Sequence, residues 1–153
     1  VRAMGRASTG VRGIKLKEQD FVVEMDVIKD PETHLFIITE NGIGKRSSID
    51  LYRFQNRGGS GIKTATINKK TGKVVAARII SKDAAGDLMI VSKNGQVIRM
   101  NLKDIPRQGR ATQGVRLMRL NQSDIVASIS LILEENIEEE KAKKPAIEQK
   151  TLV

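Results

Sequence analysis

The sequence predicts an all-β protein, a propeller-like array of four-stranded blades with two full repeats and a partial third. The first observation is a motif of Arg, small residues, Gly, an apolar residue and a second cation, which occurs three times. The second is its spacing, because the copies begin 51 and then 53 positions apart. The third is the alternation of short apolar stretches with turn residues between the copies. A repeat of this length with strand content is typical of propellers and related arrays.

The first repeat contains four expected strands joined by turn-rich stretches. They are residues 11–16, 22–28, 35–39 and 44–49. The second alternates apolar and acidic residues, so that Val23, Met25 and Val27 share one face. Asn41 and Gly42 join the last two strands as a tight hairpin turn, because both residue types tolerate positive φ.

The later repeats reproduce this order. Strands are expected at residues 62–67, 75–79, 88–92, 97–102, 115–120 and 127–131. The Asn94-Gly95 turn lies 53 positions after the first hairpin turn, and the third repeat has no such turn. Two and a half units cannot close a ring, so we expect the chain to be the later part of a longer array.

These repeats divide the chain into five parts. Residues 134–153 are highly charged and lack the repeat, which predicts a disordered tail. The expected divisions are residues 1–4 as the end of a preceding blade, 5–56 and 57–108 as blade repeats, 109–133 as a partial repeat, and the tail.

Composition excludes several classes of protein. The chain has no Cys, which rules out disulfides, thiolate catalysis and Cys-ligated zinc and fits a reducing compartment. It has no apolar run of about 20 residues, the length a membrane span needs. A cytoplasmic, nucleoid-associated protein without a membrane partner is therefore expected.

The charge of the chain favours a polyanion as partner. The net charge is +9, although the tail contains six acidic residues and only four lysines. The repeat region is therefore more basic than the whole chain, which points to nucleic acid before an anionic membrane, since no basic amphipathic helix is evident. A basic surface that serves only solubility remains the alternative.

Cations at equivalent repeat positions are the candidate DNA contacts. Arg6, Arg57 and Arg110 share one position, and Arg12, Lys63 and Arg116 share another. Since a blade array places equivalent residues along a rim, these cations predict a curved basic track for phosphates. The full expected set is Arg6, Arg12, Lys15, Lys45, Arg46, Arg57, Lys63, Arg99, Arg107, Arg110, Arg116 and Arg119.

The motifs of common catalytic sites are absent from the sequence. Arg46 follows Gly44-Lys45 where a phosphate loop needs Ser or Thr, and Ile62 stands where a nucleophile elbow around Ser60 needs Gly. The chain is expected to have no catalytic site.

Two further residues have ordinary structural interpretations. Tyr52, the only Tyr, aligns with the apolar residue Ile105 one repeat later, so packing is expected. His34 is expected on a surface loop without a metal-ligand partner. We expect no metal site or cofactor.

Several motifs in the expected order and spacing resemble the later blades of the C-terminal domain of the DNA gyrase A protein. They are Met4 to Ile14, Thr39 to Arg46, Leu51 to Gly61 and Gly109 to Val115. The resemblance covers about residues 1–133 and implies a β-pinwheel of about six four-stranded blades whose basic rim wraps duplex DNA. It implies a role in ATP-dependent negative supercoiling by the whole enzyme, with the rest of gyrase A and the gyrase B protein as partners. ATP and Mg belong to other parts of that enzyme, and this chain by itself is expected to be monomeric.

The family also has a box of Gln, a cation, Arg, two Gly, a cation and Gly in its first blade, which the resemblance connects with wrapping. Residues 55–61 match this box at five positions, with Asn56 and Ser60 in place of the cations. We interpret them as a degenerate repeat copy, which puts autonomous wrapping in question.

Three alternatives to this function differ in the surface they require. The related C-terminal domain of the topoisomerase IV A protein has fewer blades and a degraded box. A propeller that binds proteins would show apolar or aromatic loop tips, and a single-strand binder would need stacking platforms. The aromatic content of 3% argues against the last two.

Overall fold

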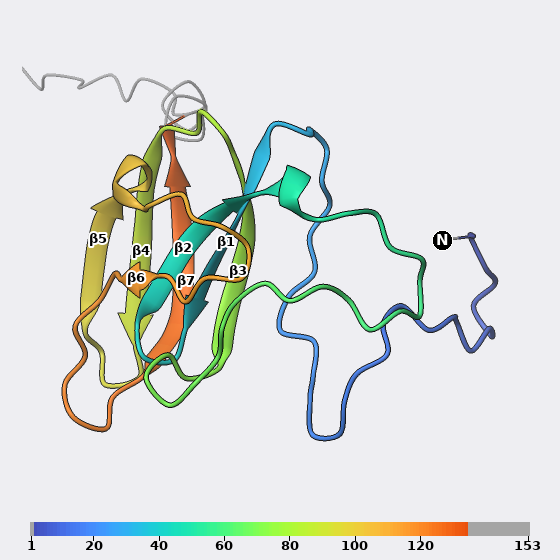
Figure 1. Ribbon diagram of the computed structural model, residues 1–153, viewed down its shortest axis with the longest axis horizontal. Coiled ribbons are helices and arrows are strands. Elements are labelled where there is room, and N and C mark those ends of the chain that lie inside the picture. Colours follow the sequence, from blue (N-terminus) through green and yellow to red (C-terminus); the bar gives the residue numbers. More distant parts are fainter. Residues whose placement is uncertain (1, 135–153) are drawn as a thin grey trace, which may run out of the picture.

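The computed structural model describes residues 2–134, which form two antiparallel sheets (Figure 1). The first sheet has the order β3-β1-β2-β6 and the second the order β5-β4-β7. The strands are β1 (Thr33–Thr39), β2 (Ile43–Ser48), β3 (Val74–Ser81), β4 (Gly86–Ser92), β5 (Val97–Asn101), β6 (Val115–Arg116) and β7 (Val126–Leu133). Two short 3-10 helices, η1 (Ile49–Leu51) and η2 (Leu102–Asp104), follow β2 and β5. No helix in this part of the chain is long and apolar enough to cross a membrane.

Both expected hairpins are confirmed. The β1–β2 turn closes through Gly42 N donating to Thr39 O at 3.0 Å, and the β4–β5 turn through Gly95 N donating to Ser92 O at 3.2 Å. Gly42 and Gly95 have φ values of 72° and 83°, which a residue without a Cβ adopts at little cost. Asn41 and Asn94 are not among the residues with positive φ, so the glycine of each Asn-Gly pair provides the left-handed conformation of the turn.

Each sheet draws strands from more than one sequence repeat. β3 pairs with β1 of the repeat before it, and β7 pairs with β4 in the same way. β6 pairs with the far edge of β2, with Ile43 opposite Arg116 and Gly44 opposite Val115. The first sheet consequently combines strands from all three repeats, and sheet boundaries do not coincide with repeat boundaries.

Three expected strands are wrong. Residues 11–16, 22–28 and 62–67 form no strand and belong to no sheet. β3 and β7 each pair with a hairpin about 40 residues before them, and no hairpin among the described residues precedes residues 22–28. A β-strand is stable only when a neighbouring strand satisfies its backbone along its length. Residues 11–16 and 62–67 make only isolated backbone bonds, through Gly13, Lys15 and Thr66, so they form no ladder despite their strand-like sequence.

The expected strand at residues 115–120 is also too long, because only β6 (Val115–Arg116) forms. Leu117 and Met118 both donate to Gly42 O, at 2.8 and 3.3 Å, and both are buried in the hydrophobic core. Alternate residues of β1 and β4, namely Phe36, Ile38, Leu88 and Ile90, also belong to that core. Burying these side chains removes apolar surface from water and holds the two sheets together.

Tyr52 lies after η1 and is half-buried. Its hydroxyl is 2.5 Å from Thr64 Oγ1. This position agrees with the packing role expected from the sequence. The predicted disordered tail, apart from Glu134, lies outside the described residues.

Replacing Gly42 with Ala is expected to cost about 2 kcal/mol more than replacing Gly95 with Ala. Both glycines have positive φ, so each substitution carries a conformational cost of about 1 kcal/mol. A Cβ on Gly42 would lie 2.6 Å from Met118 O, whereas a Cβ on Gly95 has no neighbour within 4 Å. Urea unfolding of the two variants measures the difference, and equal losses would contradict the close approach of Met118.

His34 is not on a surface loop, and that prediction is wrong. It lies near the start of β1, opposite Ile80 of β3, and is buried. Burial is the main cause that lowers the pKa of His34 below 6.5, and the nearby charges of Arg107, Arg46 and Lys82 lower it further, against a smaller opposing effect of Asp50. The sequence did not show this because β3, which covers His34, is supplied by the next repeat.

The free energy of unfolding should fall as the pH is lowered through about 6.5. Below this pH the unfolded chain binds a proton on His34 more readily than the folded chain does, because the folded pKa is lower. The contribution of neutral His34 to the free energy of unfolding is therefore complete above the unfolded pKa and is lost as the pH falls below it. His34 is the only His, so replacing it with Gln should remove this slope between pH 7 and pH 5. Urea unfolding at several pH values measures it, and an unchanged slope in the variant would refute the assignment.

Candidate nucleic-acid interface

The three copies of the repeated motif, residues 5–12, 56–63 and 109–116, are called the Gly-Arg segments. The same backbone contact recurs between consecutive segments. Lys15 N donates to Gly59 O at 2.9 Å, and at the equivalent positions Thr66 N donates to Thr112 O at 3.3 Å. In each bond the donor lies three residues after one segment, and the acceptor lies within the next segment. The three segments are therefore neighbours in space in the order of the sequence.

The cations of the Gly-Arg segments are mostly exposed. At the second cation position, Arg12, Lys63 and Arg116 all face solvent. At the first, Arg6 and Arg57 are exposed, whereas the half-buried Arg110 donates a hydrogen bond to Lys63 O. The recurrent contact therefore places segments with exposed cations next to one another.

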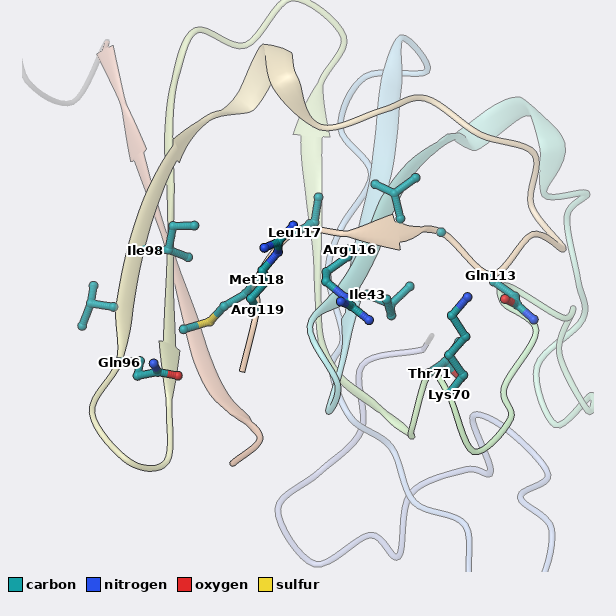
Figure 2. Close-up of a pocket in the computed structure, with 13 residues that line it drawn as sticks. Ile43, Lys70, Thr71, Gln96, Ile98, Gln113, Arg116, Leu117, Met118 and Arg119 are labelled. Carbon is teal, nitrogen blue, oxygen red and sulfur yellow. The ribbon is translucent and has the colours of Figure 1, made fainter. Parts of the chain in front are cut away.

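A cavity of about 820 Å³ lies beside the last segment, and Figure 2 shows the side chains around it. Lys70, Arg116 and Arg119 contribute cations to its lining, and no lining residue is acidic. The same three cations also line a neighbouring hollow of about 460 Å³, where Asp124 is the only carboxylate. This arrangement favours binding of an anion. The uncharged polar groups in the lining of the large cavity come from Thr71, Gln96 and Gln113.

A second group of cations surrounds Arg107. Arg107 is exposed, and its Nη2 donates to Lys82 O at 3.2 Å. Lys82, Lys103 and Arg107 line a hollow of about 550 Å³. Its single carboxylate is Asp83.

Three lysines of these groups, Lys70, Lys82 and Lys103, were not predicted from the sequence. The prediction relied mainly on cations that recur at equivalent repeat positions, although Lys45 and Arg107 were included without such an equivalent. Ser123 lies 53 positions after Lys70, and Asp50 lies 53 positions before Lys103, so these two lysines have no cation at the equivalent repeat position. Lys29 lies 53 positions before Lys82, so Lys82 did carry a repeat signal that the prediction left unused.

Lys45 was expected on the basic rim but is fully buried. Its Nζ donates to Gly109 O at 2.7 Å, Arg110 O at 2.6 Å and Thr112 Oγ1 at 3.2 Å. Burial, followed by the nearby Arg110 charge, lowers the pKa of Lys45 to about 8. Lys45 thus holds the third Gly-Arg segment against β2 instead of facing a phosphate.

Arg46 was also expected on the rim and is also buried. Its Nε donates to Ile105 O at 3.0 Å, and its Nη2 donates to Lys103 O at 3.4 Å. Burial and the Arg107 charge lower the pKa of Arg46, which still remains a cation at neutral pH. In this structure Arg46 organises the loop that carries Arg107.

Arg99 differs from Arg46 although both follow an Asn-Gly hairpin. It is exposed, and its Nη2 lies 2.5 Å from Asp87 Oδ2. An adjacent carboxylate neutralises much of the charge that a phosphate would meet. Arg99 is therefore a weaker candidate than Lys70, Arg116 and Arg119, which form no ion pair among residues 2–134.

Comparison with protein families gives a match over nearly all of the repeat region. The family described as the DNA gyrase C-terminal domain, beta-propeller, matches residues 1–29, 33–81 and 86–132. The chain belongs to this family. The all-β prediction and the resemblance to the gyrase C-terminal domain are thereby confirmed, and the fold is the β-pinwheel of that family.

Whole-protein relatives give the same family. The chain is 43% identical over 137 residues to the DNA gyrase A protein of Staphylococcus epidermidis, covering 89% of this chain and 15% of the relative. It is 41% identical over 150 residues to the DNA gyrase A protein of Staphylococcus aureus strain MRSA252, covering 97% of this chain and 17% of the relative. The chain thus spans about a sixth of the length of these relatives.

Two solved structures have a similar fold. A structure of the DNA gyrase A C-terminal domain has a TM-score of 0.74 at 33% identity, covering 86% of this chain and 44% of that one. The C-terminal domain of DNA topoisomerase IV has a TM-score of 0.68 at 21% identity, covering 78% of this chain and 36% of that one. The second likeness concerns the fold alone.

In this member of the gyrase C-terminal domain family, the box-like residues 55–61 lie largely at the surface. Arg57 is the one cation within them, and it is exposed, as are Asn56 and Ser60. Gly58 N donates to Gly13 O at 2.7 Å, so this segment also touches the strand-like residues that follow the first Gly-Arg segment. Residues 55–61 therefore offer one cation, Arg57, for contact with a phosphate.

Proposed function

We propose that the chain binds duplex DNA without sequence specificity, along the exposed cations of the Gly-Arg segments and the large cavity, and bends the DNA. The observation that carries this proposal is the recurrent bond, Lys15 N to Gly59 O and Thr66 N to Thr112 O. It repeats the spatial relation between segments, so Arg12, Lys63 and Arg116 follow one another in order.

Such an arrangement suits the phosphate backbone rather than base edges. Each phosphate that a Lys or Arg neutralises releases counterions, which favours binding entropically. Bending a stiff duplex costs several kcal/mol over a few tens of base pairs, and a series of contacts offsets that cost. No helix of the described residues is long enough to act as a recognition helix in a major groove.

Family membership supports a role for this binding within gyrase. The relatives are named as the A protein of DNA gyrase, so we propose that the chain acts with the rest of gyrase A and with the gyrase B protein. The DNA it holds would be presented for ATP-dependent negative supercoiling by the whole enzyme, without a catalytic group from this chain. Topoisomerase IV is the weaker alternative, since its C-terminal domain matches at 21% identity against 33% for gyrase.

A salt titration tests the binding proposal. The chain is mixed with labelled duplexes of about 40 base pairs in two unrelated sequences, and anisotropy is followed from about 50 to 300 mM salt. The logarithm of the association constant should fall linearly with the logarithm of the salt concentration. The slope should be about −0.9 for each phosphate contacted, with the same value for both sequences. Binding that does not respond to salt, or that differs strongly between the sequences, would refute the proposal.

A topology assay tests bending and wrapping separately. A nicked circle is ligated with the chain bound, and its linking number is compared with that of a circle ligated alone. A shift in linking number is expected if the cations hold a curved path. DNA binding without any shift would restrict the proposal to binding.

A further inference from the structure

The hollow of about 550 Å³ around Arg107, called the Arg107 hollow, has an excess of positive charge. The cations in its lining are Arg46, Lys82, Lys103 and Arg107, and Asp83 is the only carboxylate there. Among residues 2–134, these cations form one ion pair, between Lys82 Nζ and Glu32 Oε2 at 3.7 Å. Both side chains of this pair are exposed, so it contributes little. Most of the positive charge in the hollow is therefore not compensated by the described residues.

Arg46 is the cation for which a counter-charge matters most. It is only 4% exposed, and a buried charge without a partner is costly because water no longer solvates it. Its bonds to Ile105 O and Lys103 O reach neutral acceptors. Burial first and the charge of Arg107 second lower the pKa of Arg46, so the two guanidinium groups repel each other. An anion beside both groups would reduce this repulsion.

Both guanidinium groups keep donors for such an anion. Arg107 uses Nη2 to donate to Lys82 O at 3.2 Å, and Arg46 uses Nε and Nη2. The Nη1 group of each Arg makes no hydrogen bond to residues 2–134. Since a guanidinium presents its N–H groups as a planar fork that matches phosphate oxygens, phosphate is the chemistry that these free donors fit.

His34 lies beside this cluster and is the only His of the chain. His34 and Phe36 are two positions apart on β1, and Arg46 is opposite Phe36, so His34 and Arg46 lie on the same face of the first sheet. His34 Nδ1 is buried and has no hydrogen-bond partner among residues 2–134. The charged groups that act on the ring are Arg46 on β2, Lys82 after β3, Arg107 after η2 and, with the opposite sign, Asp50 on η1. An anion in the Arg107 hollow would therefore also act on His34.

The place of the hollow favours a small anion over a duplex. Figure 1 shows the two hairpin turns at the lower end of the strands and the gold coil of η2, which precedes Arg107, at the upper end. The proposed DNA contacts Arg12, Lys63 and Arg116 are exposed, whereas Arg46 is buried. A backbone phosphate carries a bulky sugar on either side, so it reaches exposed cations more readily than a buried one.

We propose that the Arg107 hollow binds a small free anion with two or three linked phosphate groups, through Arg46, Arg107 and the two lysines. Its volume lies within the range of about 300 to 1,000 Å³ that is usual for ligand pockets. A nearby negative charge favours a protonated imidazole, so binding should raise the pKa of His34 and take up a proton near pH 6. The proposal does not depend on DNA binding.

Calorimetry with inorganic triphosphate at pH 7 and constant ionic strength tests the site. The chain should bind it with a Kd below about 1 mM. Arg107→Gln should weaken binding at least about 10-fold, since charge-assisted hydrogen bonds are lost. The matched control Lys93→Gln removes an exposed lysine outside the hollow and should stay within about 2-fold. Urea unfolding checks that R107Q keeps its fold. No binding, or equal binding by R107Q and K93Q, would overturn the proposal.

The single imidazole gives a second measurement, which a general attraction of anions would leave unchanged. Proton NMR of the His34 ring is followed from pH 5 to pH 8, with and without saturating triphosphate at one ionic strength. The anion should raise the pKa of His34 by about 0.5 to 1 in the unmodified chain and in K93Q, and by less in R107Q. A pKa that saturating triphosphate leaves unchanged would place the anion elsewhere and overturn the proposal.

Competition separates a free anion from the DNA backbone. The calorimetry is repeated with a saturating duplex of about 40 base pairs at 150 mM salt, where exposed charges more than about 8 Å apart are largely screened. The affinity for triphosphate should then change less than about 3-fold. Displacement of the triphosphate, with an equal loss of triphosphate and duplex binding in R107Q, would assign the hollow to the DNA path and overturn the proposal.

Discussion

Replacing Lys45 with Met should lower the free energy of unfolding by about 4 kcal/mol. The ammonium group is fully buried and donates to Gly109 O, Arg110 O and Thr112 Oγ1. A Met of similar length fills the space but removes three hydrogen bonds from a charged donor and leaves Arg110 O without its donor, since Gly109 O still accepts from Thr112. Hydrogen bonds to charged groups contribute about 1.5 to 3 kcal/mol each, so their combined loss costs several kcal/mol. Urea unfolding at pH 7 measures the loss.

The matched control is Lys93→Met, which removes an exposed lysine and should change stability by less than about 0.5 kcal/mol. A further consequence concerns the third Gly-Arg segment. Without the ammonium group, the amides of residues 109–112 should exchange hydrogen faster than those of β1. A loss below about 1 kcal/mol with unchanged exchange would show that Lys45 does not hold the segment.

Replacing Lys70, Arg116 and Arg119 together with Gln should weaken duplex DNA binding about 100-fold at 100 mM salt. These cations line the large cavity, and none of them forms an ion pair within residues 2–134. If each contacts a phosphate, the slope of log K against log salt should lose about 0.9 for each residue. Anisotropy titrations with both duplex sequences measure affinity and slope, and the loss should be the same for each sequence.

A second triple variant separates this effect from net charge. Arg78→Gln, Arg99→Gln and Lys93→Gln remove the same charge from other exposed or half-exposed positions. Arg78 is paired with Glu24 and Arg99 with Asp87. We expect less than about a 5-fold loss from this variant. Equal losses from the two triple variants would mean that the whole positive field, and not the cavity, attracts the DNA.

Local chemistry was sufficient to predict the hairpins and the strands that follow them. Asn41-Gly42 and Asn94-Gly95 specify their turns, and the alternation in β3 and β7 needs no knowledge of distant residues. The same alternation in residues 22–28 led to a wrong strand. β3 forms because β1 lies beside it and pairs with it, whereas no described strand pairs with residues 22–28.

The candidate site was less predictable because burial is decided by distant segments. Arg46 and Arg99 share a repeat position, yet residues 106–108 cover Arg46 and nothing described covers Arg99. Lys45 carried one local signal, because it aligns with the apolar Ile98. A cation in an otherwise apolar strand position indicates a buried donor more than a surface contact.

The pairing of β2 with β6 also determines the order in which the protein can fold during translation. β2 obtains its outer neighbour only after Arg116 has left the ribosome, 73 residues behind Ile43. At a translation rate of about 5 to 20 residues per second, the outer edge of β2 stays without its partner strand for about 4 to 15 s. A single repeat is therefore not an autonomous folding unit, and the smallest piece that can mature by itself includes parts of three.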